Sequence, residues 1–509
     1  MQMRKRASVL CLLSLFLIAA SGESGTQSSR TTAIVGATVI DGTGGPPLPD
    51  ATIVVTDKRI AAVGPRSSVD VPEGALVVDA SGQFITPGLI DTNVHLSVTF
   101  ARSGPSKETA VKYWERNAEL TLEAAQMQLK YGVTTVRDSY GALLPSMEVR
   151  DAIARGEVIG PRMLVAGNIV GWGGPFSVTF SLVREEGLSL WEEQINDAVT
   201  QGSGEELMEM YPEELREAIN AYLDKGPDFI KFGGTSHWSP TFIGFSEKAQ
   251  RILVEETHKR GLIAETHSTS PEGLRISVEA GVDLIQHPEV LAGREISDEL
   301  VRQIRKREIV CSMLVNRWGG QGYQEHLEAR KGAEARLASE ESKAKKRGLK
   351  RAVKREKTSA ERRRERALLG LDTEMNRRNA KKLIEGGCIV TVGTDNAPVA
   401  APEFSRTPTG LRSVYREPGY GTISAIENLV ELGMSAGEAI VAGSRNGAIA
   451  SKGLEEFGTL EVGKFADLLV LDGDPIADIS NLRKLRWVMK EGQRIDPKTL
   501  PTNPILYER

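Results

Sequence analysis

Residues 84–96, FITPGLIDTNVHL, mark the point at which the pattern of the chain changes. Before them, between residues 33 and 79, short β-branched segments are separated by Gly, Pro and Asp turn signals, which predicts a small β-domain. After Pro87, apolar strands alternate with amphipathic helices. That order builds a parallel sheet wrapped by helices, so this stretch is expected to carry the first parallel strand.

The alternation continues to residue 395 and predicts an α/β fold. Parallel strands are expected at 84–96, 133–138, 163–170, 229–232, 262–267, 284–287, 309–315 and 389–395. Eight β/α units predict a (β/α)8 TIM barrel, here at residues 87–454. Strand signatures return after residue 455, at 459–462, 467–471 and 487–490. We therefore expect residues 30–86 and 455–509 to form one composite β-sandwich domain.

Length and composition agree with a soluble globular protein. The chain has 509 residues, of which 40% are hydrophobic and 26% are charged, and its formal net charge is -4. These values lie near the averages for soluble proteins and give no reason to expect a nucleic-acid partner. A small-molecule substrate is the expected partner, and the sequence leaves a homo-oligomer open.

The N-terminus carries the pattern of a signal peptide at residues 1–22. Three basic residues at 4–6 precede an apolar run at 7–20, and small residues follow. The run is shorter than the roughly 20 residues that span a bilayer. We therefore expect a cleaved signal, no stable membrane anchor, and an exported protein that is periplasmic or secreted. Cys311 and Cys388 would remain, both in apolar runs typical of small buried side chains.

Residues 325–370 depart from the alternation because they are strongly charged. Residues 343–366 contain 13 Lys or Arg and three Glu, a local charge of +10 that leaves about -14 on the rest of the chain. Apolar residues are sparse among them, so we expect a solvated helical insertion. The alternative is an electrostatic arm that docks on anionic surfaces.

Polar side chains recur at the predicted ends of the parallel strands. The carboxyl ends of the strands of a β/α barrel meet at one mouth, where active sites form. Three of the six histidines lie at such ends, and imidazole and carboxylate are the usual ligands of Zn and related ions. A bound divalent ion lowers the pKa of water and so supplies hydroxide near neutral pH. The candidate metal-binding residues are Asn93, His95, Lys231, His267, His287 and Asp395.

Lys231 and two loop residues raise separate expectations. An ammonium that points into the barrel without a partner is costly, so we expect Lys231 to be chemically converted there. A lysine that extends to solvent is the alternative. Trp172 and His237 follow the third and fourth strands in Gly-rich loops, which this fold uses for substrate. A substrate-binding role and a packing role are both open for these two residues.

Several motifs together resemble the amidohydrolase superfamily. The first is ITPGLID at residues 85–91, and the last is GTLEVGKFAD at residues 458–467. The others are YGVTTVRD (131–138), FIK (229–231), ETH (265–267), IQH (285–287) and GTD (393–395). The resemblance covers nearly all of residues 33–490 apart from the charged insertion. It is nearest to imidazolonepropionase-like and Xaa-Pro dipeptidase-like members.

The resemblance implies a two-metal centre, with Zn as the expected ion. In those members a lysine on strand four reacts with carbon dioxide, and the resulting carbamate bridges the two ions. Carried over, Lys231 would be the carboxylated lysine, His95 and Asp395 would bind one ion, and His267 and His287 would bind the other. Asp395 would also be the catalytic base that takes a proton from the hydroxide and passes it to the leaving nitrogen.

One residue departs from the family pattern. The family usually has His-x-His at the end of strand one, whereas this chain has Asn93-Val94-His95. An amide oxygen is a poorer Zn ligand than imidazole and suits harder ions. Two arrangements therefore stay open. Asn93 is an oxygen ligand of a weakened two-metal centre, or a single ion is held by Lys231 and the strand-five and strand-six histidines with Asp395 as base.

The expected function is hydrolysis of an amide or peptide-like C–N bond in a small molecule by metal-bound hydroxide. Export favours a dipeptide or an N-acyl amino acid as substrate. The first alternative is ring opening of a cyclic amide or imidazolone, which would use the same metals with different loops. The second is a catalytically weakened barrel that acts as a binding protein and uses the basic insertion for docking.

Overall fold

The computed structural model describes most of the chain. The described residues are 30–98, 113–177, 179, 187–237, 242–328, 330–332, 335, 371–398 and 416–507. The predicted signal peptide and most of the charged insertion therefore lie outside the described residues. Within these ranges no helix is long and apolar enough to cross a membrane.

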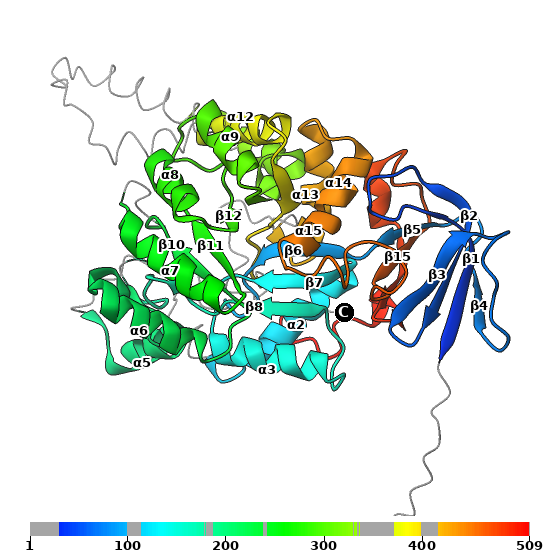
Figure 1. Ribbon diagram of the computed structural model, residues 1–509, viewed down its shortest axis with the longest axis horizontal. Coiled ribbons are helices and arrows are strands. Elements are labelled where there is room, and N and C mark those ends of the chain that lie inside the picture. Colours follow the sequence, from blue (N-terminus) through cyan, green and yellow to red (C-terminus); the bar gives the residue numbers. More distant parts are fainter. Residues whose placement is uncertain are drawn as a thin grey trace, which may run out of the picture.

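Strands from both ends of the chain form one eight-stranded sheet (Figure 1). They are β1 (Thr31–Val39), β2 (Leu48–Thr56), β3 (Arg59–Pro65), β4 (Leu76–Asp79), β5 (Phe84–Pro87), β15 (Leu468–Leu471), β16 (Leu485–Lys490) and β17 (Gln493–Ile495). Their order is β17-β16-β15-β5-β1-β2-β3, and β4 pairs with β1. Because β15 pairs with β5, the C-terminal strands continue the sheet that the N-terminal strands begin.

Strand β1 keeps β2 as one neighbour along its length but changes its other neighbour at Gly36. Residues 32–35 of β1 pair with β4, whereas residues 38–39 pair with β5. Gly36 has a left-handed φ of 86°, and a Cβ at this position would lie 2.5 Å from Ser81 Oγ. The irregularity in β1 between Val35 and Ala37 therefore depends on glycine. Both chain ends contribute to the hydrophobic core of this sheet, which includes Ile34, Ile53, Ile85, Val470 and Trp487.

The middle of the chain forms two parallel sheets whose strands follow one another in sequence. The strands are β6 (Leu89–Val94), β7 (Val133–Asp138), β8 (Arg162–Val165), β9 (Ile169–Val170), β10 (Phe229–Gly233), β11 (Ile263–His267), β12 (Leu284–Gln286), β13 (Val310–Met313) and β14 (Ile389–Val392). One sheet has the order β6-β7-β8, and the other has the order β14-β13-β12-β11-β10-β9. Helices connect most successive strands, which gives the α/β class expected from the sequence (Figure 1).

The α-helices of the described residues begin in different ways, some of them with a capping side chain. They are α2 (Asn117–Lys130), α3 (Leu143–Ala154), α5 (Leu190–Thr200), α6 (Pro212–Leu223), α7 (Glu247–Lys259), α8 (Pro271–Ala280), α9 (Asp298–Lys306), α12 (Leu371–Glu385), α13 (Tyr420–Glu431), α14 (Ala436–Ala442) and α15 (Arg445–Ile449). Ser270 caps α8 by accepting a hydrogen bond from the backbone of Gly273, and Ser435 forms a capping box with Glu438 at α14. Both helices therefore begin at a serine whose hydroxyl accepts a backbone hydrogen bond.

Three predicted strands differ in the structure. The expected strand at 84–96 is divided, because β5 joins the antiparallel sheet and β6 joins the parallel one. The expected strand at 163–170 is interrupted between β8 and β9. Residues 459–462 form no strand, since Leu460 donates its backbone N–H to the carbonyl oxygen of Asp41 in an irregular segment.

Buried side chains join the two parallel sheets. Arg137 on β7 donates a 2.8 Å hydrogen bond to Glu265 on β11, and neither side chain is exposed to solvent. The Arg137 guanidinium also lies 3.7 Å from the centre of the Phe229 ring. Thr92 on β6 and Ser312 on β13 form a second bridge of 2.8 Å. The two sheets therefore share one interior.

Replacing Glu265 with alanine is expected to lower the free energy of unfolding by about 3–5 kcal/mol, because Arg137 then keeps a buried charge without its partner. Replacing both residues, as Arg137→Met with Glu265→Leu, should recover most of this loss. Urea denaturation followed by circular dichroism measures both values. Arg116→Ala, which removes an exposed pair with Glu119, is the control and should cost less than about 1 kcal/mol. Equal losses of unfolding free energy in Glu265→Ala and Arg116→Ala would contradict this description of the interior.

Candidate active site

The predicted site residues lie at one end of the parallel strands. Asn93 is on β6, Lys231 is within β10, and His267 is the last residue of β11. His287 and Asp395 come after β12 and β14 and have left-handed φ values of 41° and 53°. This conformation is uncommon for residues other than glycine, and it concentrates at functional sites where surrounding contacts hold it in place.

Backbone hydrogen bonds join the end of β6 to the residues that follow β14, beside these site residues. The backbone N–H of Asp395 donates to the carbonyl oxygen of Asn93 at 2.7 Å. The backbone N–H of His95 donates to the carbonyl oxygen of Asn396 at 2.8 Å, and Val94 and Asn396 form an isolated parallel bridge. The backbone of the strand-one residues is thus fixed against that of Asp395.

A buried carboxylate, that of Asp91, accepts four hydrogen bonds at the same junction. The donors are the backbone N–H groups of Asn93 at 3.2 Å and Thr394 at 3.1 Å, and the hydroxyls of Thr394 and Thr422, both at 2.7 Å. Burial raises the pKa of Asp91 from 3.8 to about 6, although these hydrogen bonds lower it. Asp91 therefore positions Asn93 and the residue next to Asp395.

The Asp395 carboxylate lies between a histidine and an arginine. Its Oδ1 is 2.7 Å from His95 Nε2, and its Oδ2 accepts a 2.7 Å hydrogen bond from Arg317 Nη2. The Asp395 and Arg317 side chains are only 13% and 17% exposed. Arg317 belongs to the short 3-10 helix η3 (Val315–Arg317) directly after β13. The structure thus adds an arginine to the predicted His95 and Asp395.

His267 and His287 form a second pair. His267 Nδ1 is 3.1 Å from His287 Nε2. Burial lowers the pKa of His287 to about 3 and holds that of His267 well below 6.5, so both rings are neutral, the form that binds metal ions. Trp172 and His237 pack against this pair, with ring centroids 4.8 Å and 5.8 Å from that of His267. The two predicted loop residues therefore lie at the same site.

Lys231 is buried beside Asn93. Its Nζ is 3.4 Å from Asn93 Oδ1, and the residue is 1% exposed. Burial lowers the pKa of the Lys231 ammonium, and the negative charges of Glu265, Asp395 and Asp138 partly oppose this shift. A lowered pKa raises the fraction of neutral amine, which is the form that can attack carbon dioxide.

The spacing of the histidine nitrogens fits a divalent ion. Two nitrogens bound to one ion at about 2.0–2.1 Å would lie roughly 3.3 Å apart in tetrahedral geometry, near the 3.1 Å between His267 Nδ1 and His287 Nε2. Within the described ranges, no three His, Cys, Asp or Glu side chains gather closely enough to complete a metal site. A metal ion held by these two histidines would therefore need a further ligand of another kind among the described residues.

The site faces a cavity of about 470 Å³ at the carboxyl ends of the strands. Part of its wall is polar and part is apolar. The polar and charged residues of the wall include His237, His267, His287, Arg317 and Asp395, and the apolar ones include Val290, Leu314 and Trp318. The volume lies in the range typical of small-molecule sites.

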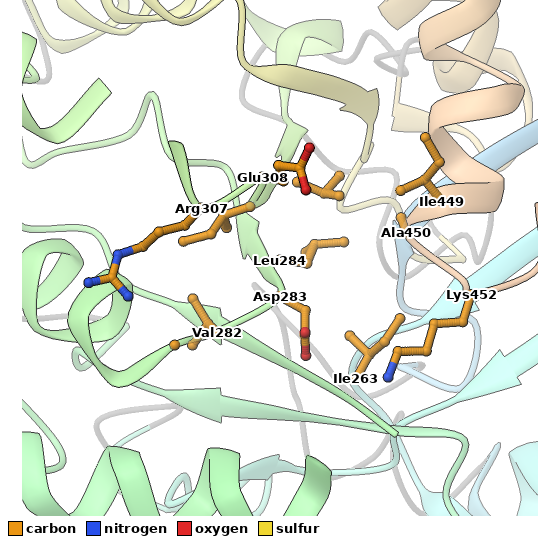
Figure 2. A pocket seen from close by; sticks show the side chains of 12 residues that line it. Ile263, Val282, Asp283, Leu284, Arg307, Glu308, Ile449, Ala450 and Lys452 are labelled. Atoms are coloured by element: carbon orange, nitrogen blue, oxygen red, sulfur yellow. The ribbon is translucent and has the colours of Figure 1, made fainter. Parts of the chain in front are cut away.

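A second cavity, of about 310 Å³, lies at the opposite ends of the strands. Its lining includes Ile263, Leu284 and Val310, which are the first residues of β11, β12 and β13. Figure 2 shows charged side chains there, among them those of Asp283 and Lys452. His267 and His287 line the first cavity instead, which makes the first cavity the candidate active site.

The sequence motifs did not single out the residues that build the wall near Arg317. Glu289 is fully buried and accepts hydrogen bonds from the backbone N–H of Leu314 at 2.8 Å and from Trp318 Nε1 at 3.2 Å. Arg317 follows the predicted end of the seventh strand by two residues, at the mouth where the other candidates lie. Its position after a predicted strand was the one feature of the sequence that could have indicated Arg317. Its contact with Asp395 depends on the turn after β13, which the sequence pattern does not specify.

The variant Asp91→Asn should remove a pH dependence of stability. The pKa of Asp91 is about 6 in the folded chain against an ordinary value of 3.8, so the folded state retains a proton that the unfolded state releases. Wild-type stability should therefore fall between pH 4 and pH 7, by about 2 kcal/mol more than that of the variant. Denaturation curves of both proteins, measured with chelator over this range, test the difference. Parallel pH profiles would show that Asp91 does not titrate in this way.

Comparison with known proteins identifies sequence relatives. The amidohydrolase family model matches residues 84–495. The chain is 25% identical to ochratoxinase of Aspergillus niger over 270 residues, which cover 52% of this chain and 55% of that protein. It is 23% identical to imidazolonepropionase of Anaeromyxobacter dehalogenans over 300 residues, covering 52% of this chain and 63% of that protein. The chain thus spans less than two thirds of the length of these relatives.

Solved structures resemble the chain over most of its length. Phenylurea hydrolase B superposes with a TM-score of 0.81 and 30% identity, covering 94% of this chain and 100% of the other. Molinate hydrolase gives a TM-score of 0.78 and 29% identity, covering 94% and 98%. A Xaa-Pro dipeptidase with bound methionine shares the fold, with a TM-score of 0.68, 21% identity and coverage of 92% and 100%. The resemblance drawn from the motifs is confirmed, and the chain belongs to the amidohydrolase family.

Proposed function

We propose that this chain is a divalent-metal-dependent hydrolase of an amide or peptide-like C–N bond in a small molecule. The observation that carries the proposal is the pair of neutral, buried histidines, His267 and His287, which line the same cavity as the Asp395 carboxylate. A pure binding protein would have no need to bury a lysine, two neutral imidazoles and a carboxylate at one mouth, because each of these groups costs free energy to desolvate.

Each residue has a chemical role in this proposal. His267 and His287 would hold a divalent ion, and their nitrogens Nδ1 and Nε2 face each other for this purpose. A divalent ion held there, with Zn as the expected ion, supplies hydroxide near neutral pH by lowering the pKa of water. Asp395 accepts a proton at its carboxylate during the attack on the substrate and delivers it to the leaving nitrogen. Trp172 and His237 pack beside the reacting centre and orient the substrate.

Carboxylation of Lys231 would supply the ligand that the histidine pair lacks. The lysine is buried with a lowered pKa, and its Nζ lies close to Asn93 Oδ1. A carbamate at this position carries a negative charge and two oxygen donors, which suit a divalent ion next to two neutral imidazoles. The proposal therefore requires dissolved carbon dioxide for assembly of the site.

The number of ions depends on Asn93 and His95. His95 Nε2 and Asp395 Oδ1 form a 2.7 Å hydrogen bond, and they would have to move apart slightly to bind a second ion, with Asn93 as a weak oxygen ligand. With a single ion, the same Asp395 carboxylate remains in place as the base. Both arrangements keep the proposed chemistry, and they differ in the strength of metal binding.

The substrate is proposed to be a dipeptide, an N-acyl amino acid or a related small amide. A cavity of about 470 Å³ with an apolar wall at Val290, Leu314 and Trp318 accommodates a molecule of this size with one hydrophobic group. Hydrolases named for ochratoxin, phenylurea and molinate are among the relatives and structural neighbours. Ring opening of a cyclic amide is the second candidate, because an imidazolonepropionase is also among the relatives.

The proposal also includes the barrel, the β-sandwich and the export that the sequence predicts. The two parallel sheets are proposed to close into one (β/α)8 barrel at residues 87–454, which the Arg137–Glu265 pair between them supports. Residues 30–86 and 455–509 are proposed to form a β-sandwich, which the change of partner along β1 supports. Export is proposed from the signal pattern at residues 1–22, and mass spectrometry of the mature N-terminus from the native host would test it.

The substitution Asp395→Asn is expected to lower kcat by about 10²–10⁴-fold, because the amide cannot accept the proton that the carboxylate accepts. The assay follows amine release from a panel of N-acyl amino acids, dipeptides and anilides by the purified, metal-loaded enzyme. The variant should keep its metal if the histidine pair is the main binding site. Full activity of the variant would rule out Asp395 as the base.

The matched control is Asp283→Asn, at the other ends of the strands. Asp283 lines the second cavity (Figure 2). Its Oδ2 lies 2.8 Å from His258 Nε2. Its replacement should change kcat by less than about threefold, since the aspartate is remote from the proposed reacting groups. A wild-type enzyme that releases no amine from any member of the panel, even after addition of Zn and bicarbonate, would contradict the proposed function.

A further inference from the structure

We propose that Arg317 is a positioning residue that holds the catalytic carboxylate of Asp395 in one orientation. The inference rests on the proposed function and extends it to a residue outside the motifs that resemble the family. Arg317 lies on the cavity wall together with His237, His287 and Asp395. It touches the proposed base directly, so its effect on the reaction would pass through that base.

The two oxygens of Asp395 have different neighbours. Oδ1 faces His95 Nε2 at 2.7 Å, on the side where an ion would be shared with the histidine. Oδ2 faces Arg317 Nη2 at 2.7 Å. A charge-assisted hydrogen bond of this length is among the stronger contacts a carboxylate makes. Because each oxygen has its own partner, a rotation of the carboxylate about χ2 would break both contacts.

Arg317 also fixes the backbone of the residue that it orients. The same nitrogen, Nη2, lies 3.3 Å from the carbonyl oxygen of Asp395 and accordingly donates to both the side chain and the main chain. Asp395 has a left-handed φ of 53°, a conformation that surrounding contacts must maintain. One guanidinium therefore stabilises the unusual backbone and the carboxylate together.

The turn that carries Arg317 is itself held by buried polar groups. Asn428 Nδ2 donates to the carbonyl oxygen of Val315 at 2.9 Å, and Asn316 Nδ2 donates to that of Thr394 at 3.2 Å. Glu289 accepts from residues on both sides of η3. A residue that positions a catalytic group must itself be locked by its surroundings, and these contacts meet that condition.

Loss of Arg317 should lower the rate of the chemical step. A displacement of the base by about 1 Å is enough to cost roughly 100-fold in rate. Arg317→Gln removes the charge and shortens the side chain, so kcat should fall by about that factor while KM changes by less than about threefold. Arg317→Lys keeps the charge without the planar fork and should recover part of kcat.

The matched control is Arg150→Gln. The Arg150 side chain is 17% exposed, as is that of Arg317, and it pairs with Asp228 at 2.9 Å, before the start of β10. Its replacement should leave kcat within about threefold of wild type. Equal loss of kcat in the two variants would mean that the loss comes from general destabilisation of the protein, and it would overturn the inference.

Two further measurements separate a positioning role from a structural one. Guanidinium chloride at millimolar concentration should raise kcat of Arg317→Gln at least tenfold by occupying the vacated position, with no gain for wild type. Co²⁺-loaded Arg317→Gln should bind as much metal as wild type but show a shifted visible absorption band, because that band reports the geometry of the ligands. An unshifted band together with no rescue would overturn the inference.

The outcomes also distinguish this inference from the proposed function. A rise in KM with unchanged kcat would overturn it by making Arg317 a substrate-binding residue. An active wild type with an equally active Arg317→Gln would overturn it while leaving the proposed function intact. A wild type that is inactive on the whole panel would contradict the proposed function, and the Co²⁺ spectra of the variants would still test the contact between Arg317 and Asp395.

Discussion

The site depends on the junction between the first and last parallel strands. The buried Asp91 carboxylate accepts hydrogen bonds from Asn93, Thr394 and Thr422, which belong to three separate segments of the chain. Desolvation of Asp91 opposes this arrangement, as its raised pKa shows, so the hydrogen bonds must offset a real cost. Without this junction Asn93 and Asp395, more than 300 residues apart in sequence, would have no fixed separation.

Burial of polar groups near this junction changes their pKa values and so their reactivity. The same loss of water that raises the pKa of Asp91 lowers those of Lys231, His267 and His287. Burial thereby favours the neutral forms of the amine and imidazole nitrogens, which are the forms that react with carbon dioxide or bind a metal ion. Deeper in the interior, by contrast, Arg137 and Glu265 stay paired with each other and join the sheets. Paired charges hold this interior together, and its mouth combines the neutral imidazoles of His267 and His287 with the charged pair of Arg317 and Asp395.

Much of the fold and of the site could be predicted from sequence. The alternation of strands and helices placed Lys231, His267 and Asp395 at strand ends because that pattern is local and periodic. A local pattern does not specify which strands pair in a sheet. The division of residues 84–96 between two sheets was therefore not predicted. The role of Arg317 was also missed, since a turn after β13 brings it to Asp395, and no periodicity encodes the direction of a side chain in a turn.

The amount of metal bound per chain tests the central claim most directly. The mature protein, purified without chelator and supplied with Zn and bicarbonate, is analysed for metal beside His267→Ala. The account predicts one or two ions per chain in the wild type and a large loss in the variant. Two ions would mean that Asn93 and His95 support a second site, and one would mean that the histidine pair and Lys231 hold a single ion. No bound metal in the wild type after this treatment would contradict the account.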